Sequence, residues 1–364
     1  MRFTLLKGSG SGPRLGRLET AHGAVETPVF MPVGTQGTVK GLMPDLLETT
    51  GARAILCNAY HLALRPGVEV VEALGGLHDF MRWPGAIVTD SGGFQIFSLA
   101  RHRKVTDEGV RFKSPLDGAT IDLSPETALA NQVRLGADVR MPLDQPVPYP
   151  ASRTETAEAT DRTTSWARRT REAVRREGLE GVFGIVQGGV HADLREKSVS
   201  EITDLDFAGY AVGGLSVGEG PERMDAILRH TVRLLPADRP RYLMGVGYAR
   251  DILSAVSAGV DMFDCTLPTR NGRNGTAFVR GGTLRLKNAV HASDPTPIDP
   301  GCSCPVCAGG FSRGYLRHLF LAGESLALIL VSLHNVWFYQ DLMAGIRGAI
   351  REGRFEAFWA SCRE

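Results

Sequence analysis

The sequence lacks any segment that would place it in a membrane or direct it out of the cell. Its longest apolar stretch runs from Ser325 to Phe338, is interrupted by His334 and Asn335, and falls short of a membrane span, which takes roughly 20 residues. The N-terminal residues 1–13 contain no hydrophobic signal-peptide core. We therefore expect a cytoplasmic protein with no membrane partner.

A marked excess of one charge is also missing. The 364 residues include 41 lysines and arginines and 40 aspartates and glutamates, for a formal net charge of +1. A near-neutral protein can still bind nucleic acid through a local basic patch. Hydrophobic residues at 43% and charged residues at 22% are typical of globular proteins. The length allows two ordinary domains or one large α/β barrel, which needs roughly 250 residues.

Cysteine is scarce, with six in the chain, but three of them are clustered. In a reducing cytoplasm clustered cysteines more often bind metal than form disulfides. Cys302, Cys304 and Cys307 lie in a Pro/Gly-rich loop, and their spacing fits three corners of a zinc tetrahedron. His334 is the natural fourth ligand, and four protein ligands would make the Zn²⁺ structural. The alternatives are three loop thiols without metal and a histidine that is simply packed.

One pattern recurs along the chain: an apolar run rich in β-branched residues, a turn marked by glycine or aspartate, and a segment with helical character. Strands that alternate with helices predict a parallel sheet, and eight strands can close a barrel. The alternative, an open doubly wound sheet, usually carries a G-x-G-x-x-G fingerprint after its first strand, and this chain has none there. We therefore predict an α/β (β/α)8 TIM barrel as a single domain over residues 1–364. The predicted strands are Pro28–Val33, Ala52–Asn58, Ala86–Asp90, Asp138–Asp144, Val182–Gln187, Tyr210–Gly213, Arg241–Gly245 and Asp261–Asp264.

Helices are predicted between these strands, and three segments lie outside the repeat. Phe3–Glu26 alternates like antiparallel strands that close the barrel floor, and Arg101–Leu123 is typical of an inserted hairpin with an Asp-Gly turn. The last segment, Glu324–Trp359, is largely helical. The predicted helices of the repeat are Pro44–Thr50, Ser124–Leu135, Thr154–Glu177, His191–Leu205, Pro221–Leu235 and Arg250–Ala258.

Three predicted strands end in aspartate, namely at Asp90, Asp144 and Asp264. The carboxyl ends of barrel strands form the active face, so these carboxylates are candidate catalytic groups. A single aspartate there would more often be a helix cap or a turn residue. Three at equivalent ends favour a catalytic face, although one of them could still be structural.

The loops after these strands indicate the kind of substrate. Gly-Gly-Phe-Gln (92–95) places Phe94 beside a carboxylate, Gln187 precedes Gly-Gly, and Gly213-Gly214-Leu215 offers backbone for close approach. Together they predict a narrow site for a flat purine-like base, with Asp144 and Gln187 bonding its polar edge. Arg270 and Arg273 follow Asp264 within ten residues and suggest phosphate groups next to the base.

Four motifs resemble those of the tRNA-guanine transglycosylases, and the similarity covers nearly the whole chain. They are Asp-Ser-Gly-Gly-Phe-Gln (90–95), Val-Gln-Gly-Gly (186–189), Val-Gly-Gly-Leu-Ser-Val-Gly-Glu (212–219) and Phe-Asp-Cys-x-Leu-Pro-Thr-Arg-x-Gly-Arg-Asn-Gly (263–275), joined by the Cys-x-Cys-x-x-Cys…His zinc site. The resemblance implies an irregular barrel with a zinc-binding subdomain at about residues 285–345. It also implies a homodimer, one structural Zn²⁺ per chain, and tRNA, guanine and a modified base as substrates.

The resemblance further implies a role for each matching residue. Asp264 would attack ribose C1′ of the wobble guanosine in tRNA, and Asp90 would act as the general acid and base. The target base would be flipped into the site. By the same resemblance Ser91, Asp144, Gln187, Gly214 and Leu215 would hold the base, Phe94 and Met244 would sandwich it, and Lys40, Arg270 and Arg273 would bind the tRNA.

Val217 bears on which base is inserted. In the family a valine in Leu-Ser-Val-Gly-Glu accompanies 7-aminomethyl-7-deazaguanine (preQ1), whereas glycine accompanies the bulkier queuine, so Val217 implies preQ1. Most bacterial members read Glu-Cys after the recognition aspartate, but this chain has Gln145 and Pro146, which alters the surroundings of Asp144. Tyr248 stands where many members have lysine.

Other functions compete with this interpretation. A non-catalytic tRNA-binding partner subunit should have lost the nucleophile or the zinc ligands, and this chain keeps them. A barrel lyase or aldolase should have a strand-end Schiff-base lysine or a phosphate cradle, and neither is evident. Exchange of queuine, or of a base in another nucleic acid, stays open within the family.

Overall fold

The computed structural model describes residues 1–99 and 103–362. Its parallel strands coincide in position with the predicted ones, although most are shorter. Nearly all of their residues are buried, which explains why these strands read as continuous apolar runs. The parallel strands are β4 (Val29–Pro32), β5 (Ala54–Asn58), β6 (Ala86–Asp90), β10 (Val139–Arg140), β11 (Gly184–Val186), β12 (Tyr210–Val212), β13 (Arg241–Leu243) and β14 (Met262–Cys265).

These strands form two parallel sheets, in the orders β10-β6-β5 and β11-β12-β13-β14-β4. Single parallel bridges connect the sheets at both junctions, Val33 with Leu56 and Arg140 with Val182. Within residues 1–99 and 103–362 the regular strand pairing therefore forms two sheets that single bridges join, and one continuous closed barrel is not shown. The alternation of parallel strands with helices is confirmed.

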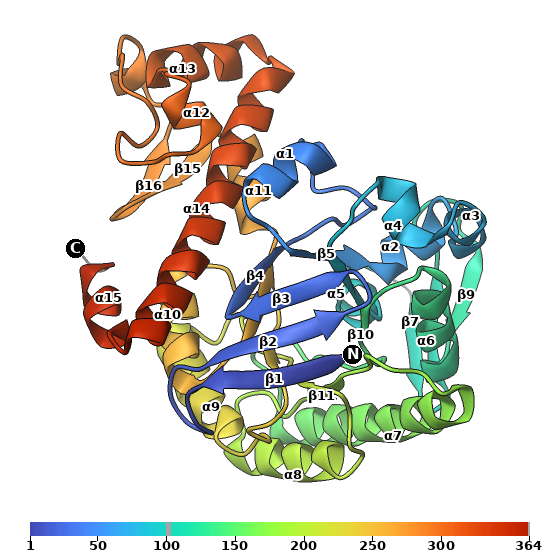
Figure 1. The fold of residues 1–364 in the computed structure, drawn as a ribbon. Coiled ribbons are helices and arrows are strands. Elements are labelled where there is room, and N and C mark those ends of the chain that lie inside the picture. The colour runs from blue at the N-terminus through green and yellow to red at the C-terminus, as the bar shows by residue number, and fades with distance from the viewer. Residues whose placement is uncertain (100–102, 363–364) are drawn as a thin grey trace.

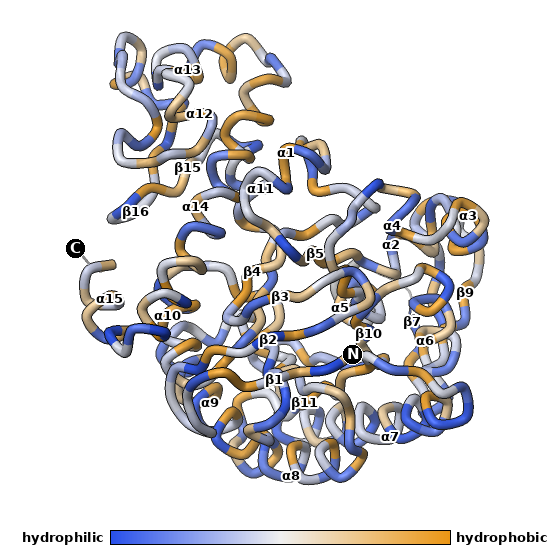
Figure 2. Tube along the Cα trace, viewed as in Figure 1, coloured by the Kyte–Doolittle hydropathy of each residue, from blue (hydrophilic) through white to orange (hydrophobic). Residues whose placement is uncertain are grey.

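The predicted helices form with small shifts at their ends. Ser124 caps one of them by accepting a hydrogen bond from the Thr127 amide, and Ser152 and Glu155 form a capping box at the start of another. Figure 2 shows hydrophilic residues recurring along α7, the longest of this group. The helices are α1 (Pro44–Thr49), α6 (Pro125–Arg134), α7 (Arg153–Glu177), α8 (Ala192–Thr203), α9 (Pro221–Val232) and α10 (Ala249–Ala258).

Several short helices lie outside the predicted ones, and two of them, after Asp90 and after Asp264, occupy segments that were expected to be loops. The segment after Asp264 is helical because Pro268 stands at its first turn and Leu267 is buried. A Cβ on Gly272 would lie 2.8 Å from the Ser332 backbone, so glycine lets two helices touch there. The short helices are α2 (Ala59–Leu64), α3 (Val68–Ala73), α4 (Gly76–Met81), α5 (Gly93–Leu99) and α11 (Leu267–Arg273).

Two antiparallel sheets flank the parallel strands. The N-terminal sheet consists of β1 (Arg2–Lys7), β2 (Leu15–Thr20) and β3 (Gly23–Thr27), which confirms the antiparallel prediction for this segment (Figure 1). The insertion is a three-stranded sheet rather than a simple hairpin; the first residue of that prediction, Arg101, lies outside the described residues. Its strands are β7 (Arg103–Thr106), β8 (Gly109–Lys113) and β9 (Thr120–Leu123).

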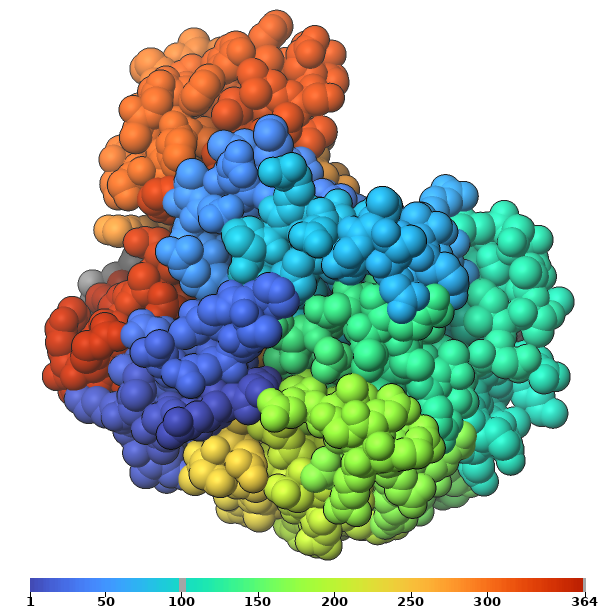
Figure 3. Space-filling model, turned by 45° about the vertical axis from the view of Figure 1, so that its right-hand side comes forward, coloured from blue at the N-terminus to red at the C-terminus, as the bar shows by residue number. Residues whose placement is uncertain are grey.

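The C-terminal part forms a lobe that protrudes from the body of the molecule (Figures 1 and 3). A long helix, α14 (Ser325–Glu352), runs from this lobe back along the parallel strands and ends beside α15 (Phe355–Ser361). By length and composition α14 could cross a membrane, but 61% of its most apolar window is buried inside the fold. The lobe also contains β15 (Thr276–Val279), β16 (Gly282–Arg285), the 3-10 helix η1 (Ala289–His291), α12 (Pro305–Ala308) and α13 (Arg313–Ala322).

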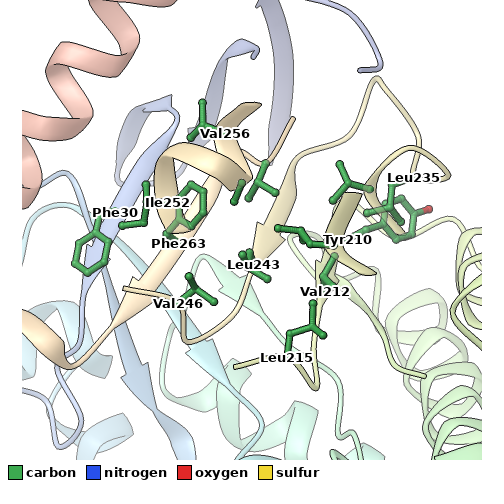
Figure 4. Packing of buried hydrophobic residues seen from close by; sticks show 14 of the residues in the cluster. Phe30, Tyr210, Val212, Leu215, Leu235, Leu243, Val246, Ile252, Val256 and Phe263 are labelled. Carbon is green, nitrogen blue, oxygen red and sulfur yellow. The ribbon is translucent and has the colours of Figure 1, made fainter. Parts of the chain in front are cut away.

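The largest apolar core lies between the parallel strands and the helices that cover them. Figure 4 shows Phe30, Leu243 and Phe263 from the strands packing near Ile252 and Val256 of α10. This packing holds the strand ends in fixed positions, which a site built on several strands requires.

A buried ion pair joins the N-terminal sheet to the last parallel strand. Arg14 Nε donates to Asp261 Oδ1 over 2.9 Å, and both side chains have no exposed surface. The second carboxylate oxygen, Oδ2, accepts the backbone amide of Arg241 over 2.8 Å. The Arg14 guanidinium also donates to the carbonyl oxygens of Ala237 and Arg239. Every charge in this cluster is therefore satisfied by a defined partner.

Candidate active site

Asp90 ends β6 and is held by three donors. Its Oδ1 accepts the Ala59 amide over 3.0 Å, and its Oδ2 accepts Gln95 Nε2 over 2.9 Å and the Asn58 side-chain amide. Burial raises the pKa of Asp90 to about 7, against the lowering effect of these hydrogen bonds, and the charge of Asp264 raises it further. A carboxyl group that titrates near neutral pH can both give and take a proton.

Asp264 lies on β14, and the two hydrogen bonds that it makes within the described residues fall on one oxygen. The Tyr242 hydroxyl donates to Oδ1 over 2.5 Å, and the Gly245 amide donates to the same atom over 2.8 Å. Burial raises the pKa of Asp264, while these two donors lower it. Tyr242 is fully buried, and its pKa is well above the ordinary value because of burial and the neighbouring Asp264. The phenol therefore stays protonated and keeps the carboxylate in one orientation.

Asp144 lies four residues after β10, which is shorter than the predicted strand to Asp144, and it meets Gln187, the residue after β11. Gln187 Nε2 donates to Asp144 Oδ2 over 2.7 Å, and both side chains are buried. Burial raises the pKa of Asp144 to about 6, although the Gln187 bond lowers it. A Cβ on Gly214, whose φ is +65°, would lie 2.3 Å from the Gln187 amide oxygen, and one on Gly93 would lie 2.5 Å from Asp144 Oδ1. Glycine is thus required for backbone to approach this pair.

Arg195 holds the loops after β11 and β12. Its guanidinium is fully buried and donates to the carbonyl oxygens of Gly189 over 2.9 Å and Gly213 over 2.9 Å. Burial lowers the pKa of Arg195 to about 9, and the charge of Glu219 opposes this. Glu219 accepts the backbone amides of Ser216 and Val217, with Val217 at 2.8 Å. The segment that carries Leu215 and Val217 is therefore fixed through its backbone.

The remaining predicted residues differ in burial and come from several elements. Ser91 is buried after Asp90, whereas Phe94 on α5 is 56% exposed. Met244 follows β13 and is half-buried. Arg270 is exposed at the end of α11, Arg273 is half-buried, and Lys40 is exposed between β4 and α1.

The sequence did not single out Asn58, Gln95, Tyr242 or Arg195, which bond to the predicted residues. Asn58 is the last residue of a strand, like Asp90, and this position was the one available signal for it. Gln145, which departs from the family pattern, accepts a hydrogen bond from Arg162 over 2.7 Å. Its amide thus ties the end of the Asp144 segment to α7.

The predicted metal ligands come together in the protruding lobe. Cys302, Cys304, Cys307 and His334 each offer a ligand atom within 4.8 Å of the others. His334 Nδ1 lies 3.4 Å from the sulfurs of Cys304 and Cys307. Its Nε2 lies 2.7 Å from the Phe278 carbonyl oxygen, which can only accept, so Nδ1 presents its lone pair to the thiols. The four residues could hold a metal ion.

Comparison with known proteins identifies relatives along the whole chain. Residues 9–364 match the family model described as queuine tRNA-ribosyltransferase. A queuine tRNA-ribosyltransferase of Solidesulfovibrio magneticus is 55% identical over 360 residues, which is 98% of this chain and 96% of the relative. One from Azoarcus sp. is 53% identical over 356 residues, with 98% and 96% coverage, and one from Desulforudis audaxviator is 52% identical over 365 residues, with 99% and 98% coverage. The chain belongs to the queuine tRNA-ribosyltransferase family.

Proposed function

We propose that the enzyme replaces the wobble guanine of tRNAs with G-U-N anticodons by preQ1, through a covalent aspartyl-ribose intermediate. The family makes it a pentosyltransferase with tRNA-guanine transglycosylase activity in queuosine biosynthesis. The mechanism rests on one observation. Asp90 and Asp264 are two carboxyl groups that hydrogen bonds fix in place, and the charge of Asp264 raises the pKa of Asp90. The proposal includes an irregular barrel formed by the eight parallel strands and a zinc-binding subdomain at about residues 285–345.

In this mechanism Asp264 is the nucleophile. Both of its hydrogen bonds fall on Oδ1, which directs Oδ2 to ribose C1′. The bond from Oδ2 to C1′ forms as the bond from C1′ to the guanine nitrogen breaks, and that bond's electron pair leaves with the base. Asp90 in its protonated form gives a proton to the departing guanine. It then takes a proton from the incoming preQ1, whose nitrogen attacks C1′ and releases Asp264.

The other residues orient the substrates. Asp144 and Gln187 bond the edge of the base, with Ser91 and the backbone of Gly214 and Leu215 completing its contacts. Phe94 and Met244 lie on its two faces, and Val217 selects the small preQ1 side chain. Lys40, Arg270 and Arg273 contact the tRNA backbone.

The direct test is incorporation of radiolabelled guanine into unmodified tRNA with a G-U-N anticodon. We expect exchange by the purified chain without any added subunit. An absence of exchange would instead favour the non-catalytic partner subunit. Competition in the same assay should show preQ1 displacing guanine far better than queuine does, and the reverse order would refute the argument from Val217.

Replacement of Asp90 by asparagine should separate activity from stability. We expect exchange to fall by roughly 10²- to 10⁴-fold because no proton is transferred. The pKa of Asp90 in the native state, about 7, lies above its value of 3.8 in the unfolded chain. The contribution of Asp90 to the free energy of unfolding is therefore complete below pH 3.8 and is lost as the pH rises through 7. Asp90→Asn should therefore melt at a higher temperature than the parent at pH 8, with a smaller difference at pH 5, in scanning calorimetry. A lower melting temperature at pH 8 would contradict the burial argument.

The Cys302, Cys304, Cys307 and His334 cluster is proposed to hold one structural Zn²⁺. Its three thiols and one ring nitrogen match the donors of closed zinc sites, and Cys304 and Cys307 pack within the apolar core of the lobe. Four ligands leave no position for a reacting water. The ion would thus fold the lobe without taking part in base exchange.

Cys304→Ser should remove this ion and unfold the lobe. We expect the zinc that survives dialysis against EDTA to fall from one ion per chain to almost none, and the thiolate charge-transfer band of the cobalt form to disappear. Serine at Cys362, an exposed cysteine outside the cluster, is the matched control and should leave both signals unchanged. Retention of tightly bound zinc by Cys304→Ser would exclude that sulfur as a ligand.

The enzyme is further proposed to be a cytoplasmic homodimer. Val290, Tyr315 and Leu321 are exposed apolar side chains on the lobe, at 78%, 41% and 61% exposure. Exposed apolar side chains on one lobe support a self-association surface there. Light scattering coupled to size exclusion would measure the mass of the assembly.

A further inference from the structure

A second group of metal-ligating side chains lies at the amino-terminal ends of the parallel strands, opposite the carboxylates of the active site. His22 stands in the turn between β2 and β3, His78 on α4, and Asp138 directly before β10. One ligand atom from each residue lies within 4.8 Å of the other two. Neither the proposed base exchange nor the cysteine cluster uses these residues.

Asp138 is the centre of the group. Its Oδ1 lies 2.8 Å from His22 Nδ1, and its Oδ2 accepts the Ile87 amide over 2.9 Å and lies 3.3 Å from His78 Nε2. Burial alone would raise the pKa of Asp138, but the neighbouring His78 and His22 rings and the Ile87 amide lower it to about 2. The carboxylate is therefore ionised at neutral pH and nearly buried, with 3% of its side chain exposed.

Within the described residues, one ring nitrogen of His78 has no hydrogen-bond partner. Its Nδ1 lies 3.0 Å from the Trp83 carbonyl oxygen, which can only accept, so Nδ1 carries the hydrogen. In the neutral ring Nε2 then points a lone pair at Asp138, and this buried nitrogen makes no hydrogen bond of acceptable geometry within the described residues. A lone pair facing a carboxylate is repulsive unless a cation or an additional proton lies between them.

The surroundings fit a cation at this point. A histidine that donates its second ring nitrogen to a backbone carbonyl, as His78 does to Trp83, is the usual arrangement for a metal ligand. Two imidazoles and a carboxylate are the donors that Zn²⁺, Co²⁺ and Ni²⁺ prefer. An adjoining cavity of ≈ 360 Å³, lined partly by His22, Asp138 and Arg140, gives an ion and its waters access. Arg140 donates from Nη1 to the Glu180 carbonyl oxygen, and Glu180 is paired with the N-terminal amino group.

We propose that His22, His78 and Asp138 bind one divalent transition-metal ion, separate from the ion in the cysteine cluster. The two imidazole rings are stacked, with centroids 3.3 Å apart and planes at 15°. Because His22 is on a hairpin turn and 36% exposed, its ring turns to direct a nitrogen at the ion. The bound ion links the N-terminal sheet to α4 and β10 through three residues that lie more than fifty positions apart in the chain.

The test uses Zn²⁺ and Co²⁺ with the full-length protein whose cysteine cluster is already loaded. Equilibrium dialysis against micromolar Zn²⁺ should add a second, EDTA-removable ion per chain and raise the melting temperature by roughly 3 to 5 °C. Co²⁺ at this site should give weak d–d bands without thiolate charge transfer, which distinguishes it from the cysteine cluster. His22→Ala and Asp138→Asn should each lose the second ion and the thermal shift.

Two control variants distinguish loss of the metal site from loss of the fold. His230→Ala removes an imidazole from α9, remote in sequence from the group, and should keep the second ion. His22 is exposed, so His22→Ala should fold and retain guanine exchange even if Asp138→Asn does not fold. Binding of no second ion by the parent protein would overturn the proposal, as would its retention in His22→Ala. A melting temperature that does not respond to Zn²⁺ would also overturn it.

Discussion

Asp264→Asn should abolish guanine exchange, with a loss of at least about 10⁴-fold in kcat/KM. The amide cannot form the ester to C1′ that the proposed mechanism requires, and loss of a covalent nucleophile generally has effects of this size. The parent enzyme mixed with tRNA should give a covalent complex on a denaturing gel, and the variant should give none. The measurement is single-turnover exchange together with this gel.

Binding should survive the substitution. Asparagine still accepts hydrogen bonds from Tyr242 and Gly245, so the local structure is expected to persist and tRNA should bind within a few-fold of the parent. A variant with more than a tenth of the parent activity would sink the assignment of Asp264 as nucleophile. It would leave the base-exchange activity itself intact, because the parent is assayed in parallel.

Asp261→Asn, three residues earlier in the chain, should lower the stability of the protein but leave guanine exchange intact. It leaves the buried Arg14 guanidinium without its counter-charge, and breaking a buried pair in this way costs about 3–5 kcal/mol in the free energy of unfolding. Below its denaturation temperature the variant should still exchange guanine, because Asp261 lies at the other end of the strand from the reacting oxygen. Urea unfolding at pH 8 measures the loss.

A surface pair provides the matched control for Asp261. Arg111 and Asp122 are joined across β8 and β9, with 65% and 64% of their side chains exposed. Asp122→Asn should leave the urea midpoint unchanged within error, since exposed ion pairs are screened by solvent. Equal effects of Asp261→Asn and Asp122→Asn would mean that burial of Arg14 does not set the cost.

The active-site aspartates illustrate how far sequence reasoning reaches. Asp90, Asp144 and Asp264 could be selected because each ends a predicted strand, and strand ends of one parallel sheet must share an edge. Their separate environments could not be predicted, because Tyr242 and Asn58 reach the carboxylates from neighbouring strands. Hydrogen bonds between residues far apart in sequence depend on the register of the strands, and this register cannot be read from the sequence.

What the sequence by itself determined was the order of parallel strands and helices, the carboxylates at the strand ends and the spacing of the cysteine ligands, since these depend on local periodicity and on nearby residues. Only the tertiary structure decided that the strands form two sheets linked by single bridges, that the segment after Asp264 is the helix α11, and which partners hold each aspartate. It also decided that His22, His78 and Asp138 meet. The predicted strand Asp138–Asp144 has an aspartate at each end, and folding places Asp144 beside Gln187 and Asp138 between two histidines. The physical reason is that the two ends of a parallel strand open onto opposite faces of the molecule. Aspartates at the two ends of one predicted strand therefore meet different partners and serve different chemistry.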